Sequence, residues 1–321
     1  MGASPHPRPG PRSHAVQLAA NSLTAAAVWL SASAVPIANA QSLEPRSYAN
    51  IPVGTSFLIL GYSHTRGGVA FDTSVPVSNP HLNVDSGILA YARAFDLAGS
   101  AAKFDVVVPV SSLEGAATNQ GAPVERAVSG FGDPAFRLSW NFHGSPALTA
   151  RQFASYRQDL LVGASVQVSV PVGQYDPAKL VNLGANRWFV KPEIGVSKAL
   201  GPWTLEGKGS VTFFSGNDDF FGGNRRTQEP LYAIQGNVIR DFGAGRWMSV
   251  DATYFAGGRN TLNGTPLANL QQNWRVGLTL AMPVDAHNAL KLAFSRGVSA
   301  RTGNNYDLFG IFWQHAWSAG L

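Results

Sequence analysis

The sequence predicts an all-β protein: a transmembrane antiparallel β-barrel of about twelve strands, with an apolar exterior facing lipid and a polar lumen. Three observations support this prediction: apolar and polar residues alternate, short and long gaps are sorted, and tryptophans cluster near strand ends. The chain has 321 residues, 13% of them charged, and no cysteine. Soluble domains usually have about a quarter of their residues charged. Without cysteine the chain forms no disulfide and no thiolate metal site.

Residues 1–40 have the pattern of a secretory signal peptide. Arg8 and Arg12 supply a positive start, residues 23–35 an apolar core, and Ala38-Asn39-Ala40 the small residues before a cleavage site. A transmembrane helix is the alternative, but polar residues keep the apolar run below the ~20 residues that a span needs. The long, proline-rich start also favours a start codon further downstream. We therefore expect an exported protein without a membrane-spanning helix.

Residues 41–55 form a separate N-terminal segment before the predicted barrel, which covers residues 56–321. This segment contains Pro52 and Gly54, which make it irregular. Two interpretations fit it: a tail in the periplasm, or a plug folded into the lumen.

Twelve segments, each roughly a dozen residues long, alternate between apolar and polar side chains, as strands with one apolar and one polar face do. The stretches between them have no apolar period of 3.6 residues, so we expect few helices. The predicted strands start near Ser56, Ser86, Ala102, Phe131, Tyr156, Trp188, Trp203, Leu231, Trp247, Asn273, Leu290 and Tyr306.

The gaps between these strands are sorted by length. Gaps after strands two, six, eight and ten are short, as in "LAGSA" and "ALGP", whereas most gaps after odd-numbered strands are long. The fourth gap is intermediate, and the eleventh, "RTGNN", departs from the rule. Membrane barrels have short turns on one side and long loops on the other, and a soluble sandwich has no reason to sort its loops. An even strand count places both termini on the short-turn side.

Tryptophans give an independent test of which face looks outward. Each tryptophan after residue 40 lies near a predicted strand end, where a membrane-interface belt needs an apolar ring with a polar N–H. Several of them share parity with the apolar face of their strand, so that face is predicted to contact lipid. The predicted belt consists of Trp140, Trp188, Trp203, Trp247, Trp274, Trp313 and Trp317.

The opposite, polar face is then predicted to line the lumen. Lipid offers no partners to charged groups, so their confinement to one parity is expected. Positive and negative residues are close to balance, unlike the single-sign rings of an anion or phosphate channel. The candidate lumen and constriction residues are Arg93, Lys103, Asp105, Arg137, Asp159, Lys191, Glu193, Glu206, Lys208, Asp251, Arg275 and Lys291.

No cofactor or metal site is predicted. The sequence has no phosphate-binding G-x-x-x-x-G-K-[ST] loop. Asp218 and Asp219 lie in a long external loop without the ligand spacing of a calcium site, so we expect a loop facing solvent or lipopolysaccharide. The histidines after residue 40 are scattered, which argues against zinc.

Two functions other than transport remain as alternatives. An embedded lipid hydrolase would need a histidine and a serine at neighbouring outward positions. His64 and Ser299 are the candidates, although the chain lacks a G-x-S-x-G signature, and no catalytic residue is predicted. A non-conducting structural barrel is the second alternative.

The expected partners follow from the predicted location in the bacterial outer membrane. They are outer-membrane lipid, lipopolysaccharide and the barrel-insertion machinery. The last strand keeps an alternating aromatic pattern but ends on Leu321, where outer-membrane barrels usually have an aromatic residue. Nucleic acid is not expected despite a net charge of +5, because the longest basic run is Arg225-Arg226.

Several stretches resemble the outer-membrane transporter family associated with the meta-pathway of phenol degradation. They are "YANIPVG" (48–54), "GFGDPAFRL" (130–138), "VSVPVGQYDPAKLVNLGANRW" (168–188), "KPEIGVSKALGPWTLE" (191–206), "FFGGNRRTQEPLYAIQG" and "SARTGNNYDLFGIFWQ". The resemblance covers nearly all of the chain after the signal peptide. It implies an outer-membrane barrel that passes hydrophobic or aromatic compounds, and it carries over no catalytic motif.

The predicted strand number also limits the solute. Barrels of about eight strands are filled by their side chains, and open pores have about sixteen or more. A twelve-stranded barrel should therefore be narrow. We expect a passive channel or transporter for small hydrophobic or aromatic solutes, either through the lumen or along a lateral path.

Overall fold

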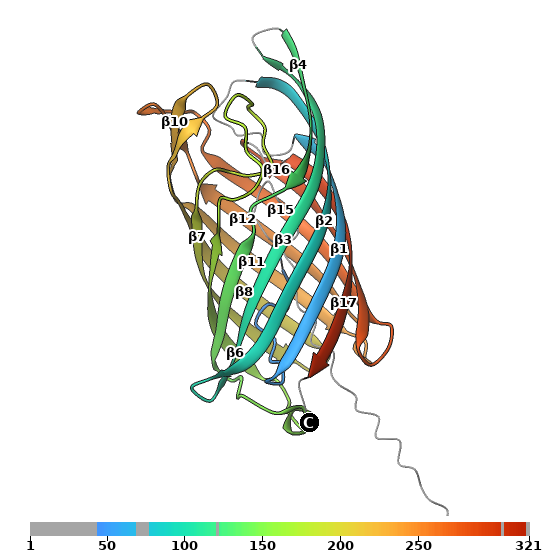
Figure 1. Ribbon diagram of the computed structural model, residues 1–321. Coiled ribbons are helices and arrows are strands. Elements are labelled where there is room, and N and C mark those ends of the chain that lie inside the picture. The colour runs from blue at the N-terminus through green and yellow to red at the C-terminus, as the bar shows by residue number, and fades with distance from the viewer. Residues whose placement is uncertain (1–43, 69–76, 120–121, 303–304, 319–321) are drawn as a thin grey trace, which may run out of the picture.

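The computed structural model describes residues 44–68, 77–119, 122–302 and 305–318, which are almost entirely β-structure (Figure 1). The predicted signal peptide and Leu321 lie outside these ranges. The strands of the main sheet are β1 (Thr55–Gly68), β2 (Val77–Leu97), β3 (Ser100–Asn119), β4 (Ala122–Phe131), β5 (Ala135–His143), β6 (Leu160–Ser169), β7 (Phe189–Leu200), β8 (Trp203–Phe214), β11 (Leu231–Asp241), β12 (Trp247–Gly257), β15 (Gln271–Pro283), β16 (Asn288–Ala300) and β17 (Asn305–Ser318).

These strands close into a barrel in which every pairing between adjacent strands is antiparallel. The first and last strands seal it, since β1 pairs with β17 from Thr55↔Ser318 to Gly68↔Asn305. Both β4 and β5 pair with β3, so they form one barrel strand interrupted at residues 132–134. The barrel therefore has twelve strands, which confirms the predicted fold class.

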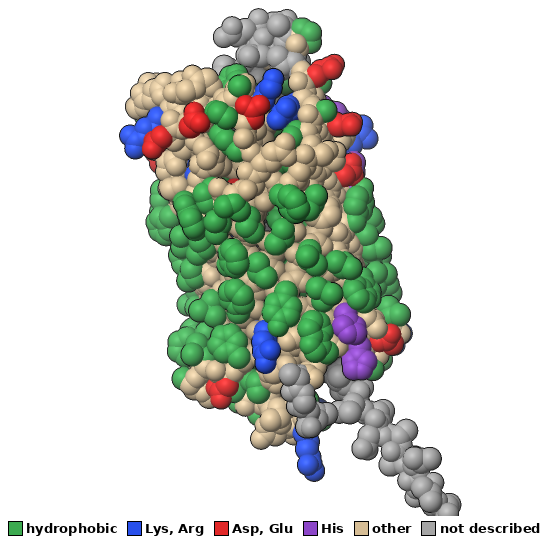
Figure 2. Space-filling view, in the orientation of Figure 1, with side chains coloured by type: hydrophobic (Ala, Val, Ile, Leu, Met, Phe, Trp, Pro, Cys, Tyr) green, Lys and Arg blue, Asp and Glu red, His purple; other side chains and the backbone are tan. Residues whose placement is uncertain are grey.

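The orientation of the two strand faces is inverted relative to a soluble protein. On β8, Leu205 is 44% exposed whereas Glu206, the next residue, is only 7% exposed. The same alternation holds on β5, β7 and β15. A space-filling view shows apolar side chains over the middle of the barrel and most charges at its ends (Figure 2). A closed sheet leaves no backbone edge for lipid to meet. This is the architecture of a bacterial outer-membrane barrel, with lipid and lipopolysaccharide around its exterior.

The turns at the end of the barrel where β1 begins and β17 ends are short, except for the connection of residues 144–159 between β5 and β6. The long connections lie at the other end, where only the connection between β16 and β17 is as short as a turn among those that join neighbouring barrel strands (Figure 1). The long connections contain more β-structure than predicted. β2 begins at Val77 rather than near Ser86, because β2, β3 and β4 continue pairing beyond the barrel wall. Further strands form a small four-stranded sheet there: β9 (Asn217–Phe220), β10 (Asn224–Gln228), β13 (Asn260–Leu262) and β14 (Thr265–Pro266).

Helical structure is minor in the described ranges. The element α1 (Ala150–Phe153) lies in the connection between β5 and β6, where the side chain of Thr149 caps it by accepting the N–H of Gln152. None of the helices in the described part of the chain is long and apolar enough to cross a membrane.

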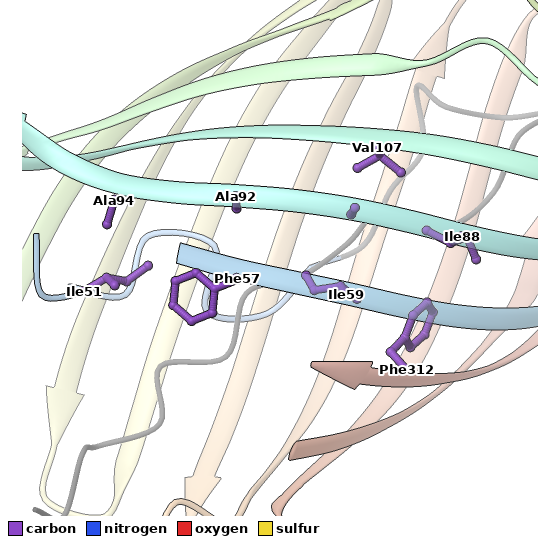
Figure 3. Close-up of a cluster of buried hydrophobic side chains, with 9 residues drawn as sticks. Ile51, Phe57, Ile59, Ile88, Ala92, Ala94, Val107 and Phe312 are labelled. Carbon is purple, nitrogen blue, oxygen red and sulfur yellow. The ribbon is translucent and has the colours of Figure 1, made fainter. Parts of the chain in front are cut away.

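The inner wall of the barrel has an apolar stripe that the sequence pattern did not predict. Buried apolar side chains of β1, β2 and β17 face inward, and Val107 of β3 joins them (Figure 3). Parity alone predicted a polar lumen, but both faces of β1 and β2 are largely apolar over this part. The stripe consists of Phe57, Ile59, Ile88, Ala90, Ala92, Ala94, Val107 and Phe312, with Ile51 packed on it.

Candidate functional site: the barrel lumen

Most of the predicted lumen residues lie on the inner wall. They project from neighbouring strands opposite exposed apolar residues, so the strand period alone places them together. Glu193 is half-buried. The fully buried ones are Lys103, Asp105, Arg137, Lys191, Glu206, Lys208, Asp251, Arg275 and Lys291.

Two predicted lumen residues are placed elsewhere. Arg93 is exposed, because the inward positions beside it on β2 belong to Ala92 and Ala94. Asp159 precedes β6, where strand alternation no longer applies, and its side chain is 77% exposed and paired with Lys198. Neither residue lines the lumen, and the prediction for both was wrong.

One predicted belt residue is also misplaced. Trp247 is 1% exposed and packs inside the barrel with Ile239, Ala281 and Ala289, with the Arg46 guanidinium 5.0 Å from its ring centre. Trp247 lies four positions before Asp251 and therefore on the same face of the strand. Since Asp251 was predicted to face the lumen, the sequence already indicated an inward position for Trp247. The other six predicted belt tryptophans are 36–48% exposed on the outer face.

A buried ion cluster joins the N-terminal segment to the inner wall. The Arg137 guanidinium donates to Glu44 Oε2 at 2.9 Å and to both carboxylate oxygens of Asp105 at 3.1 and 3.2 Å. Lys103 Nζ lies 3.9 Å from the same Asp105 carboxylate. Glu44 is 4% exposed, so its carboxylate lies deep within the barrel rather than in solvent.

The residues after Glu44 hold further contacts with the wall. The Arg46 N–H donates to Glu206 Oε2 at 2.8 Å, and its guanidinium pairs with Asp241 at 3.1 Å. Lys208 Nζ donates to the Glu44 carbonyl at 2.6 Å and to Ser47 Oγ at 3.0 Å. Residues 44–54 therefore lie inside the barrel.

Tyr48 fits a recess made by two glycines. A Cβ at Gly195 would lie 2.3 Å from the Tyr48 ring, and one at Gly163 would lie 2.6 Å from it. The hydroxyl of Tyr48 donates to Glu193 Oε1 at 3.0 Å. The family-like stretches "YANIPVG" and "KPEIG" thus contact one another. The sequence showed both stretches but did not predict that they contact each other.

At the opposite end, the 170–188 connection is tied to the wall by Asp133. This residue lies in the break between β4 and β5, and its carboxylate accepts the N–H of Gly173 at 2.8 Å and of Ala185 at 2.7 Å. A Cβ at Gly173 would lie 2.6 Å from the Gly132 backbone, so the glycine permits this close approach. Two more of the family-like stretches, "GFGDPAFRL" and "VSVPVGQYDPAKLVNLGANRW", therefore also meet.

Two side chains of the 170–188 connection are buried in the opening of the barrel at this end, which we call the barrel mouth. Val181 and Leu183 pack against inward-facing apolar residues of β2, β3 and β17: Leu82, Val84, Leu113, Tyr306 and Leu308. Along β2 this apolar mouth leads into the apolar stripe, interrupted by Ser86, whose hydroxyl bonds that of Ser111. Apolar contact surface thus runs along one side of the lumen, and charged groups occupy the other.

The alternative hydrolase pair is not assembled. His64 lies on β1, where its Nδ1 is 2.9 Å from Asp85. Ser299 lies on β16 opposite Trp274 of β15, and β17 separates β16 from β1. Within the described ranges, no three histidine, aspartate or glutamate side chains are grouped as a metal site requires.

The fold and lumen define the class of this protein: an outer-membrane β-barrel with a charged and apolar interior. Residues 65–314 match the family described as "Putative MetA-pathway of phenol degradation". The match covers most of the chain, so the chain belongs to this family, which confirms the resemblance seen in the sequence. No curated protein sequence matches the chain.

Solved structures with a similar fold include a channel and an autotransporter domain. The COG4313 outer membrane channel from Pseudomonas putida F1 is 21% identical and superposes with a TM-score of 0.72, over 86% of this chain and 100% of that one. The β domain of the Bordetella autotransporter BrkA is 10% identical with a TM-score of 0.50, over 82% and 100% of the two chains. At these identities the similarity concerns the barrel fold.

Proposed function

We propose that this protein is a passive outer-membrane channel for small hydrophobic or aromatic compounds and that it has no catalytic activity of its own. The observation that carries the proposal is the apolar surface inside the barrel, from the mouth around Leu82 and Leu308 to the stripe around Ile59 and Phe312. A lumen filled only with water and charges would repel apolar solutes. An apolar inner surface gives such solutes a favourable path because burying their surface releases water.

The proposed channel is narrow. Twelve strands enclose a lumen between the filled barrels of about eight strands and the open pores of about sixteen. Paired charges such as Arg137 and Asp105 occupy part of this space. We propose that the lumen side chains form the constriction of the channel. Small solutes are the partners that pass through this constriction.

In the proposed channel, residues 44–54 act as a plug on the side of the chain termini. Glu44, Arg46 and Tyr48 each bond an inner-wall side chain, and Val53 and Gly54 donate backbone N–H groups to Leu148 and Ala94. These contacts are numerous enough to hold the segment in place, and each is local enough to be removed by a single substitution.

Reconstitution in liposomes and planar bilayers tests the proposed function. The mature protein is first shown to be folded by the shift in gel mobility between unheated and boiled samples. We expect small conductance steps, influx of phenol-sized solutes and no influx of large sugars. Rapid flux of large sugars would contradict the narrow lumen. Absence of conductance, with unchanged growth of a deletion strain on aromatic compounds, would favour a structural barrel instead.

A further inference from the structure

The aromatic ring of Phe312 lies against the inner wall of the barrel at a place where the wall has no side chains. Phe312 is on β17 opposite Gly61 of β1, and its ring lies across β1 beside Ile59 (Figure 3). Gly61 follows Ile59 by two residues and Gly310 precedes Phe312 by two, so both glycines occupy inward positions of their strands. The ring therefore rests on two glycines that belong to two neighbouring strands.

Both glycines are needed for the ring to occupy this position. A Cβ at Gly61 would lie 2.4 Å from Cδ1 and 2.8 Å from Cε1 of Phe312, and a Cβ at Gly310 would lie 2.7 Å from Cε2 and 2.9 Å from Cζ. Ordinary contacts of a Cβ begin near 3.4 Å. Neither glycine has a positive φ, so alanine would meet no backbone strain at either position. The ring alone explains why these positions lack a side chain.

A ring displaced from the two glycines can move only toward the lumen. Phe312 is paired with β1 on one side and with β16 on the other, so the sheet is continuous around it. On β16 its partner is Lys291, whose Nζ lies 4.9 Å from the ring centre. A cation at this distance is attracted to the face of a ring, which helps to hold the ring in place. The glycines thus keep an aromatic side chain of the apolar stripe out of the lumen.

We propose that Gly61, Gly310 and Phe312 set the width of the apolar route through the barrel, and with it the size of the largest apolar solute that passes. The inference deepens the proposed function and rests on it for transport along the apolar stripe. Along β1, Gly61 lies between the residues that pair with Val84 of the mouth and Ile59 of the stripe. A solute that enters at the mouth therefore passes the ring before it reaches Ile59.

Cysteine labelling tests this assignment, because the chain has no cysteine of its own. Ile59→Cys places a single thiol on the stripe beyond the ring in the full-length mature protein, folded in detergent micelles. The thiol is modified with a slim reagent, methyl methanethiosulfonate, or with a wider one, benzyl methanethiosulfonate. Since residues 44–54 occupy the barrel at the other end, we expect both reagents to reach the thiol from the mouth.

The second substitution is made in this Ile59→Cys protein. We expect Gly61→Ala to slow the benzyl reagent severalfold and the methyl reagent less, because the displaced ring narrows the route. Adding Phe312→Ala to Gly61→Ala should restore the benzyl rate, since no ring is left to be displaced. Gly87→Ala, on the outward face of β2, is the matched control, because a Cβ there would meet only the Val110 carbonyl at an ordinary 3.8 Å.

Equal benzyl rates in the Gly61→Ala and Gly87→Ala proteins would overturn the assignment, and so would a slow rate that Phe312→Ala does not restore. The gel-mobility shift shows whether each variant is folded. Gly310→Ala displaces the opposite edge of the ring and provides the test if Gly61→Ala does not fold. Labelling needs no transport, so the expected labelling without solute influx into liposomes would refute the proposed channel and leave the ring as the narrowest point above the stripe. Influx of phenol-sized solutes with equal labelling of all variants would do the reverse.

Discussion

A single methyl group at position 195 should displace the N-terminal segment from the barrel wall. The Cβ of alanine in Gly195→Ala would lie 2.3 Å from Tyr48 Cε2 and 2.6 Å from Cδ2, where ordinary contacts begin near 3.4 Å. The ring must therefore withdraw by about 1 Å or more. The backbone of Gly163 borders the opposite edge of the ring, so the ring has no room to tilt away from the new methyl group.

The expected magnitude follows from two contributions. Overpacking of this kind costs about 1–3 kcal/mol, and the hydrogen bond from Tyr48 to the Glu193 carboxylate at 3.0 Å contributes about 1.5–3 kcal/mol. Water replaces part of that bond after the ring withdraws, so a total near 3 kcal/mol is reasonable. At 1.4 kcal/mol per tenfold, the docked fraction of the segment falls by roughly a hundredfold relative to the undocked one.

Trypsin provides the assay, because Arg46 is a cleavage site within the segment and its side chain is only 17% exposed when docked. We expect cleavage after Arg46 to be much faster in Gly195→Ala than in the wild type, and channel conductance to rise in parallel. Gly209→Ala on β8 is the matched control, since a Cβ there would meet nothing within 4 Å. If Gly195→Ala and Gly209→Ala behave alike in both measurements, the docking of Tyr48 between the two glycines is refuted.

Three further predictions concern the mouth, the interior and a turn. Asp133→Ala removes the acceptor of the Gly173 and Ala185 N–H groups. Trypsin should therefore cleave after Lys179 faster in Asp133→Ala than in the control Asp218→Ala, which changes an exposed carboxylate on β9; equal rates would contradict the role of Asp133. Trp247→Ala should lower the free energy of unfolding by about 3–5 kcal/mol, as for other buried aromatic residues. Trp188→Ala, on the lipid-facing surface, should lower it by less. Urea titration in lipid vesicles measures both values. In the β15–β16 turn, the N–H of His287 and then the side chain and N–H of Asn288 hold the pKa of Asp285 below its usual value. The stabilisation from this carboxylate is therefore complete above its unfolded pKa and is lost only as pH falls through the lowered value, which ¹³C NMR titration of the carboxyl carbon would detect; an unshifted midpoint would contradict these bonds.

Strand number, strand faces and location followed from the sequence alone. The period of two is a local property, so Leu205 and Glu206 could be assigned to opposite faces from their neighbours without knowledge of the fold. The parity of charged residues and tryptophans then decided which face met lipid. The same reasoning placed Arg137, Lys191 and Glu206 inside the barrel.

Predictions from local sequence failed where the alternation of apolar and polar residues ended, or where both faces of a strand were apolar. Asp159 lies just before a strand. The stretch of β2 around Arg93 is largely apolar, so the alternation there did not show that the inward positions belong to Ala92 and Ala94. Trp247 was assigned to the belt from its position at a strand end, although its parity with Asp251 indicated the interior.

The contacts that shape the lumen were decided only by the tertiary structure. Tyr48 and Glu193 lie 145 positions apart, and Arg137 meets Glu44 across 93 positions. No periodic pattern encodes such contacts, because they depend on how twelve strands close and which space that closure leaves for a non-strand segment. The sequence by itself determined a membrane barrel with charges inside. Closure of the barrel determined that residues 44–54 lie among those charges.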